Sequence, residues 1–195
     1  SPQKNGDLVY QSLNSLLPAE KRTFADVWNI QELNGAILFQ ASENIFVYEK
    51  NKLKVISPTH NSFASISFKI NDALFLRERK IGLMKWDGKS LSLVPEGAFL
   101  QNTAVIGMIN FPTQSSKNIL TLSVDEGFSY IDTEKGKVSK YNSPSERELN
   151  SIGVLGMEWF NDSTIILNTR SGVYFLDNKL TIIRTITKED GLVDE

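Results

Sequence analysis

From Phe24 onward, the hydrophobic residues of this 195-residue chain come in short runs separated by turn-forming residues. Short apolar runs bounded by Asn, Asp and Gly are typical of β-strands. Leu13, Leu16 and Leu17 near the N-terminus have helical spacing instead, and Pro18 would end a helix there. The pattern therefore predicts an all-β protein preceded by a short N-terminal helix.

A second pattern runs along the whole chain: a turn residue, an apolar residue and, five positions after the turn residue, an acid. The turn residues recur after 38, 45 and 45 residues and are Asn44, Gly82, Gly127 and Gly172. The matching acids are Glu49, Asp87, Asp132 and Asp177. A repeat of this length indicates stacked supersecondary units. Each unit has room for four strands, expected in the first unit at Asp26–Ile30, Ala36–Gln40, Ile45–Tyr48 and Leu53–Ile56.

Four antiparallel strands in each repeat of about 40 residues are typical of a β-propeller blade. A β-sandwich is the alternative fold, but it does not explain the repeat. We expect an N-terminal remnant at 1–23, four blades within 24–187 and the start of a following blade at 188–195. The expected blades are 24–61, 62–99, 100–150 and 151–187. Because the chain starts without Met and stops within an apparent unit, we expect it to be a fragment of a longer protein.

The turns support this register. The first two strands of three units are joined at Asn34-Gly35, Asn71-Asp72 and Asn161-Asp162, residues that tolerate the positive φ of tight hairpins. In the third unit the same turn is expected to be enlarged to Pro112–Asn118.

Composition excludes several classes of function. The net charge is −2 and no dense block of Lys and Arg occurs, so nucleic acid binding is disfavoured. The absence of cysteine excludes disulfides and thiolate metal sites, and no apolar run is long enough to span a membrane. The only histidine, His60, cannot build a multi-histidine metal site and is expected in an exposed loop. We therefore expect no metal, no cofactor and no catalytic residues in this segment.

Candidate binding residues gather between the second and third strands of the units. In a propeller these loops share one rim with the connections between blades, so charged residues there would surround a channel mouth. Guanidinium groups could bind carboxylates or sulfates. The candidate ligand contacts are Arg77, Arg79, Lys80, Arg170, Glu43 and Asp125, with a solvated rim as the alternative interpretation.

Carboxylates on the same rim leave an enzyme open, because glycoside cleavage needs two of them at the right separation. The candidates for such a pair are Glu43, Glu78, Asp125 and Glu126. Structural roles are expected instead for the turn glycines Gly82, Gly127 and Gly172 and for the acids Asp87, Asp132 and Asp177, which can accept backbone N–H bonds. The tryptophans Trp28, Trp86 and Trp159 are expected to pack between blades rather than to stack on sugars.

The repeats resemble the two-component regulator propeller repeats of bacterial sensor proteins. Leu167–Asp177 is similar to that family's strand, Thr-x-x-Gly and strand-Asp core, and Asp190-Gly191-Leu192 matches its step into the next blade. Tyr10 to Trp28 resembles a stretch that precedes a blade in sensors with a later triple-tyrosine module. The chain departs from the family at Asn44, which replaces a glycine, and at the charged run Arg77–Lys80.

The resemblance implies a sensory input domain that lies outside the inner membrane and is not an enzyme. A transmembrane helix would connect it to a histidine kinase or a helix-turn-helix output, and the ligand could be an oligosaccharide. A polysaccharide-cleaving propeller and a protein-interaction scaffold remain the alternatives. Because four blades do not comfortably close a ring, we expect an open arc with an apolar blade face exposed at each end, and self-association through those faces.

Overall fold

The computed structural model describes residues 10–60, 62–111 and 118–192, and its strands form four antiparallel sheets of four strands each. In every sheet the strands lie side by side in chain order. The first blade contains β1 (Asn29–Leu33), β2 (Ala36–Gln40), β3 (Ile45–Glu49) and β4 (Lys52–Ile56). The second contains β5 (Phe63–Ile70), β6 (Ala73–Glu78), β7 (Gly82–Trp86) and β8 (Leu91–Leu93). The third contains β9 (Val105–Asn110), β10 (Asn118–Ser123), β11 (Gly127–Asp132) and β12 (Lys137–Lys140). The fourth contains β13 (Val154–Asn161), β14 (Thr164–Thr169), β15 (Val173–Leu176) and β16 (Ile182–Ile186).

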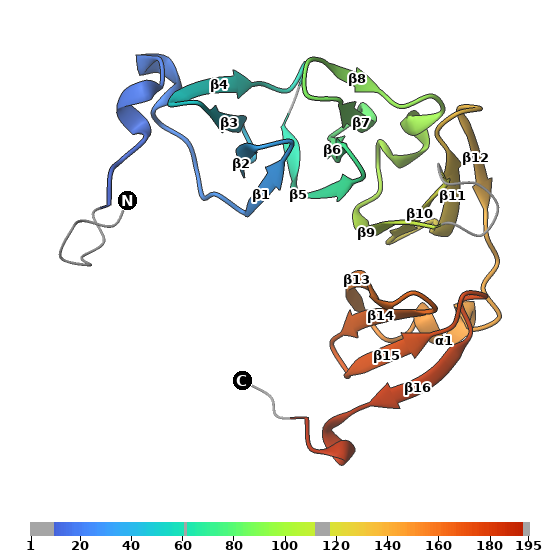
Figure 1. Cartoon of the computed structure of the whole chain (residues 1–195). Helices are drawn as coiled ribbons and strands as arrows, with labels where there is room; N and C mark the ends of the chain where they lie inside the picture. The colour runs from blue at the N-terminus through green and yellow to red at the C-terminus, as the bar shows by residue number, and fades with distance from the viewer. Residues whose placement is uncertain (1–9, 61, 112–117, 193–195) are drawn as a thin grey trace.

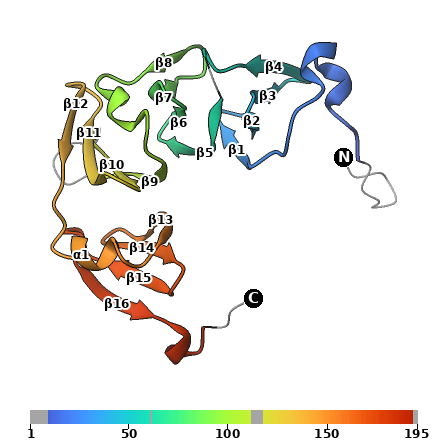
Figure 2. The ribbon, with the colours of Figure 1, turned by 180° about the vertical axis from the view of Figure 1, so that it is seen from behind.

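The four sheets follow one another around an arc that stays open (Figure 1). The first strand of each sheet, β1, β5, β9 or β13, lies on the concave side, and the fourth strand lies on the convex side. The view from behind shows the same separation between the two ends of the arc (Figure 2). This is the arrangement of β-propeller blades, and it confirms the predicted fold class.

One strand lies later than the sequence indicated. The first strand was expected at Asp26–Ile30, whereas β1 is Asn29–Leu33. The reason is the two-residue turn at Asn34 and Gly35, whose φ values are 53° and 81° and which pairs Leu33 directly with Ala36. The enlarged turn expected at Pro112–Asn118 falls mostly outside the described residues.

The short N-terminal helix is a 3-10 helix, η1 (Asn14–Leu16), followed after Pro18 by a second one, η2 (Ala19–Lys21). Leu17 is extended, with φ −85° and ψ 147°, because a residue that precedes proline is disfavoured in the helical region. This segment covers the outer face of the first blade, where Leu17 is 5% exposed beside Phe46 and Phe24 lies 4.6 Å from the Phe46 ring. The expectation of an exposed apolar face at each end was therefore wrong for the first blade.

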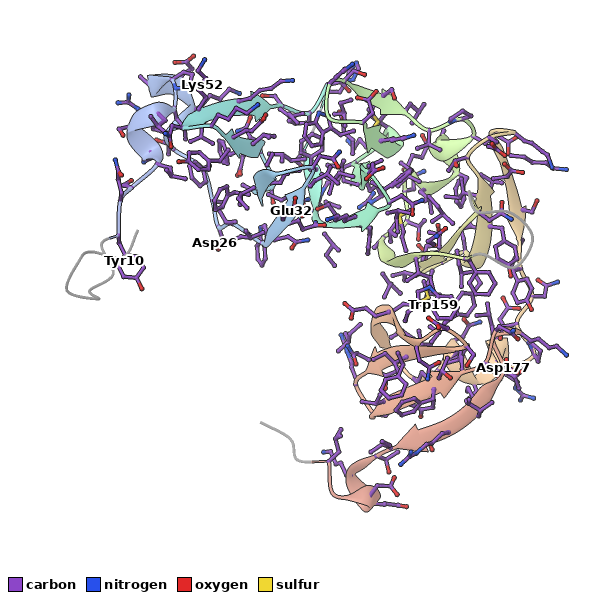
Figure 3. The ribbon with its side chains drawn as sticks, viewed as in Figure 1. Tyr10, Asp26, Glu32, Lys52, Trp159 and Asp177 are labelled. Atoms are coloured by element: carbon purple, nitrogen blue, oxygen red, sulfur yellow. The ribbon has the colours of Figure 1, made fainter. Side chains whose placement is uncertain are left out.

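Apolar side chains fill the spaces between neighbouring blades. Leu33 and Val47 of the first blade pack with Leu74 and Trp86 of the second, and an equivalent cluster joins the second blade to the third. Between the third and fourth blades the ring of Trp159 stacks on Phe111 at 5.6 Å, and its indole N–H donates to Asn110 O at 2.8 Å. Figure 3 shows Trp159 between the two sheets. Trp86 and Trp159 therefore pack between blades, whereas Trp28 is 58% exposed.

Candidate functional site

The loops between the second and third strands of the blades lie beside the connections that join one blade to the next. Arg79 N donates to Ser62 O at 3.0 Å, Lys80 N to Gln101 O at 3.1 Å, and Arg170 N to Gly153 O at 3.2 Å. Each of these bonds ties a loop to a connection. Because the strands are antiparallel, these loops and connections all lie on one side of the arc, which we call the rim.

Arg77 does not project freely from this rim. It is half-buried, and its Nη1 atom donates to Gln101 O at 3.1 Å in the connection to the third blade. Burial lowers the pKa of Arg77 from its ordinary value, and the charge of Arg79 lowers it further. A guanidinium remains charged under these conditions. Its contact is with backbone, between two blades.

Glu78 is fully buried and points toward the first blade. Its Oε1 accepts hydrogen bonds from Thr59 Oγ1 at 2.8 Å and from His60 N at 2.7 Å. The carboxylate therefore fixes the connection between the first two blades. His60 itself is exposed, and its Nδ1 lies 3.0 Å from Thr59 Oγ1.

A groove of about 280 Å³ opens on the rim between the third and fourth blades. Asp125 and Glu126, in the loop between β10 and β11, lie at its edge and are exposed. The opposite wall comes from Lys140 at the end of β12 and from the connection that contains α1 (Glu146–Leu149). The other residues lining the groove are Ile106, Leu122, Ser123, Val124, Gly127, Phe128, Glu146, Leu149, Asn150, Gly153 and Val154.

Charges of both signs face this groove. Lys140 Nζ lies 4.0 Å from Glu146 Oε1, and both side chains are partly exposed. Arg170 lies beside Gly153, which lines the groove. A Cβ placed on Gly153 would be only 3.3 Å from Arg170 Cδ. The loop is held by Asp125 N, which donates to Thr103 Oγ1 at 3.1 Å. The groove thus combines carboxylates, cations and an apolar floor, the mixture that binds small polar ligands.

Of the six predicted ligand contacts, Asp125 alone lines this groove, and Arg170 lies beside it at Gly153. Glu43 is exposed in the loop of the first blade, and Arg79 and Lys80 are exposed in the loop of the second, so these three do not line the groove. Whether any of the six touches a ligand stays a prediction.

Lys140, Glu146 and Asn150 were not among the candidate residues. Lys140 ends β12, and Glu146 and Asn150 come from the connection after the third blade, for which the sequence analysis predicted no element. Ser145 followed three residues later by Glu148 is the signature of a helix start and could have indicated α1.

The aspartates that follow the third strands lie in tight turns. The Oδ1 atom of Asp87 accepts from Lys89 N and Ser90 N at 2.9 and 2.8 Å, and Asp132 and Asp177 each accept two backbone N–H bonds in the same way. Because hydrogen bonds to backbone N–H groups stabilise the charged form, the pKa values of Asp87 and Asp132 lie below the ordinary range.

The glycines that begin the third strands have positive φ. Gly82 has φ +130° and Gly172 has φ +150°, and a Cβ on either would collide with backbone, at Gly97 and Ile186 respectively. These positions exclude side chains for steric reasons as well as conformational ones. Gly127 has φ +64° beside Glu146 at the groove.

Two features are absent from the described part of the chain. No three His, Asp or Glu side chains there gather closely enough to hold a metal ion. Within the same residues, no helix has the length and apolar character needed to cross a membrane.

The fold is similar to that of several solved structures. The extracellular domain of BT3049, a proposed hybrid two-component system from B. thetaiotaomicron, matches with a TM-score of 0.64 and 16% identity over 86% of this chain and 23% of that one. The extracellular domain of the proposed one-component system BT4673, from the same organism, matches with a TM-score of 0.56 and 12% identity over 83% and 22%. The WD40 domain of Neurospora crassa Pan2 matches with a TM-score of 0.58 and 14% identity over 83% and 49%.

No protein-family model and no curated protein sequence matches the chain. The chain spans less than a quarter of the two sensor domains, 23% and 22% of their lengths. Those two structures are extracellular domains of the kind of sensor that the repeats resemble, so they confirm the resemblance at the level of the fold. The chain therefore has a propeller fold shared with extracellular domains of bacterial one- and two-component systems and with WD40 domains.

Proposed function

We propose that this chain is part of an extracytoplasmic, ligand-sensing propeller of a bacterial signal-transduction regulator. The observation that carries the proposal is the rim groove between the third and fourth blades, on a fold shared with the extracellular domains of such systems. The proposed role is binding without catalysis, with a histidine kinase or helix-turn-helix output elsewhere in the full-length protein. The propeller would lie outside the inner membrane.

The groove suits a small polar ligand or one residue of an oligosaccharide. Its volume of about 280 Å³ lies just below the roughly 300–1,000 Å³ typical of ligand sites. The carboxylates of Asp125 and Glu126 could accept hydrogen bonds from hydroxyl groups, and Lys140 could donate a hydrogen bond to a ligand oxygen. Leu122 and Phe128 form an apolar floor. Sugars present this combination of hydroxyl edges and apolar faces.

Transmission of the signal would begin at the connection that contains α1. Glu146 and Asn150 of this connection line the groove. The same connection is bonded to the fourth blade, because Ser143 Oγ donates to Leu180 O at 2.6 Å. Ser145 Oγ also accepts from Ile182 N at 3.0 Å. A ligand changes an equilibrium only through different affinities for two states. A ligand that contacts α1 could therefore favour one position of the fourth blade over another.

Thermal unfolding against a panel of oligosaccharides tests the proposal. A ligand at one hundred times its Kd stabilises the folded state by about 2.7 kcal/mol. We expect Asp125→Asn and Lys140→Gln to abolish the shift, while the charge-matched changes Asp162→Asn and Lys137→Gln, at exposed positions away from the groove, retain it. No shift with any ligand, or equal shifts in all four variants, would count against the groove.

A polysaccharide-cleaving enzyme is the second candidate, because Asp125 and Glu126 lie together at one groove. Prolonged incubation of any stabilising oligosaccharide, followed by analysis of chain length, separates the two functions. Intact ligand supports sensing, and cleavage that is lost in Asp125→Asn supports catalysis.

We also propose self-association through the outer face of the fourth blade. Phe160 is 61% exposed, its ring lies 5.4 Å from that of Phe175, and Ile166 pairs with Phe175 on the same face. Exposed apolar faces of this kind are typical of interaction sites. The partner would be a second copy of the chain, which would bury the face that a following blade would cover in a longer propeller.

A further inference from the structure

A second groove, of about 460 Å³, lies between the first and second blades at the edge opposite the rim. It is formed where the β1–β2, β3–β4 and β7–β8 turns come together, at Asn34, Lys50 and Gly88. It shares no residue with the groove between the third and fourth blades. Nothing in the proposed sensing site depends on it.

Positive charge dominates the mouth of this second groove. Three lysines line it, Lys50, Lys52 and Lys54, against the single carboxylate of Glu49. Lys50 Nζ is paired with Glu49 Oε1 at 3.1 Å, and Lys54 Nζ donates to Lys89 O at 3.3 Å. Lys52 has no ion pair among the described residues, and Figure 3 places it at the start of β4 on the convex side.

The wall of the groove contains an unpaired hydrogen-bond donor. Trp86 is 3% exposed, packs with Leu33 and Val47 of the first blade, and lines the groove. Its Nε1 atom is buried and makes no hydrogen bond within the described part of the chain. A buried donor without a partner destabilises the folded state, so an acceptor that reached it would offset that cost.

We propose that this groove binds a small oxyanion, such as a carboxylate, sulfate or phosphate group. One oxygen would accept from Trp86 Nε1, and the remaining charge would be neutralised by Lys52 and Lys54. Trp86 Nε1 is itself buried, so an oxygen atom would reach it only after neighbouring side chains move. Lys52 and Lys54 are exposed and have the flexible stems that such a movement needs. Charge-assisted hydrogen bonds of this kind are roughly twice as strong as neutral ones.

The indole N–H signals in a ¹⁵N-correlated NMR spectrum test the proposal on the whole chain. The sequence has three tryptophans, and Trp86→Phe assigns the relevant signal. The probes are inorganic sulfate, inorganic phosphate and glucose 6-sulfate, with sodium chloride at matched ionic strength and unsulfated glucose as controls. We expect the Trp86 signal to move with the oxyanions alone. Saturation by the inorganic ions would identify a free anion site, and saturation by the sugar sulfate alone would identify an ester group.

Lys52→Gln provides a second variant that does not disturb the core. We expect it to raise the apparent Kd about threefold or more, because a direct charge contact is lost. Lys137→Gln, an exposed lysine on the third blade, removes the same charge at a distance and should leave the Kd unchanged. An unmoved Trp86 signal, or equal weakening in the two lysine variants, would overturn the proposal.

Discussion

Gly107 of β9 lies against Met157 of β13 so closely that a Cβ on Gly107 would be 2.5 Å from Met157 Cβ. Strands on the concave side of the third and fourth blades can approach this closely because the glycine has no side chain. Gly156, also on β13, has no such neighbour, and a Cβ there would be 3.8 Å from its nearest neighbour, Asn168 Nδ2. Gly107 therefore allows the close approach of two blades, whereas Gly156 does not have this role.

Gly107→Ala is expected to lower the free energy of unfolding by about 1–3 kcal/mol, because the added methyl group forces the two strands apart. Gly156→Ala is the matched control and should change stability little, since the added methyl group would make only an ordinary van der Waals contact with Asn168. Chemical denaturation of both variants measures the difference. Equal stabilities would mean that the backbone of β9 relaxes without loss.

Trp159→Phe should lower stability by about 1 kcal/mol, because it keeps an aromatic ring on Phe111 but removes the bond to Asn110 O. Trp28→Phe is the control, since Trp28 is exposed. If the two variants lose the same stability, the hydrogen bond between the third and fourth blades contributes nothing measurable.

The turn aspartates predict a dependence of stability on acidity. Since the pKa of Asp132 is lowered in the folded state by backbone bonds from Lys135 and Glu134, its charge stabilises the fold above the unfolded pKa of about 3.9. That stability is lost as the pH falls through the lower, folded value.

Asp132→Asn should therefore flatten the loss of stability between neutral and acidic pH while retaining a turn acceptor. Denaturant unfolding at several pH values from 7 to about 3 provides the measurement. Asp26→Asn removes the same charge from an exposed site that makes no hydrogen bond among the described residues. An identical pH dependence in the two variants would contradict the role of the Asp132 turn.

The outer face of the fourth blade predicts concentration-dependent assembly. Phe160→Ser removes an exposed aromatic ring from that face and should shift the chain toward monomer in sedimentation experiments. Ile30→Ser, at an equally exposed position on the first blade, serves as control. A wild-type chain that stays monomeric at high concentration would rule out this interface.

The repeat pattern was enough to predict the four-stranded blades because turn chemistry and strand patterning agree in the turns that the structure describes. Asn34-Gly35 illustrates this agreement, yet it also shows its limit. The turn was identified, but the predicted strand began too early because it included the apolar residues Val27 and Trp28. Pairing through the turn places the strand at Asn29–Leu33.

The binding face was harder to predict, because charge alone does not reveal which side a strand residue faces. Arg77 and Glu78 are neighbours in sequence, but they point to different blades and bond to connections on opposite sides. Lys140 and Glu146 could not be paired from the sequence, since their proximity depends on the path of a connection. Trp86 was correctly expected in the core, but its lack of an acceptor is a property of the packed structure.

Leu17 and Phe24 cover the outer face of the first blade, so the two ends of the arc are not equivalent. Every strand pairs with its sequence neighbour, so a blade can form as soon as its own residues are available. During synthesis, the first blade could therefore be complete and shielded before the second emerges, and each later blade would find a finished surface to pack on. The order of translation and the order of assembly would then be the same, and at each stage the uncovered outer face would belong to the blade made last.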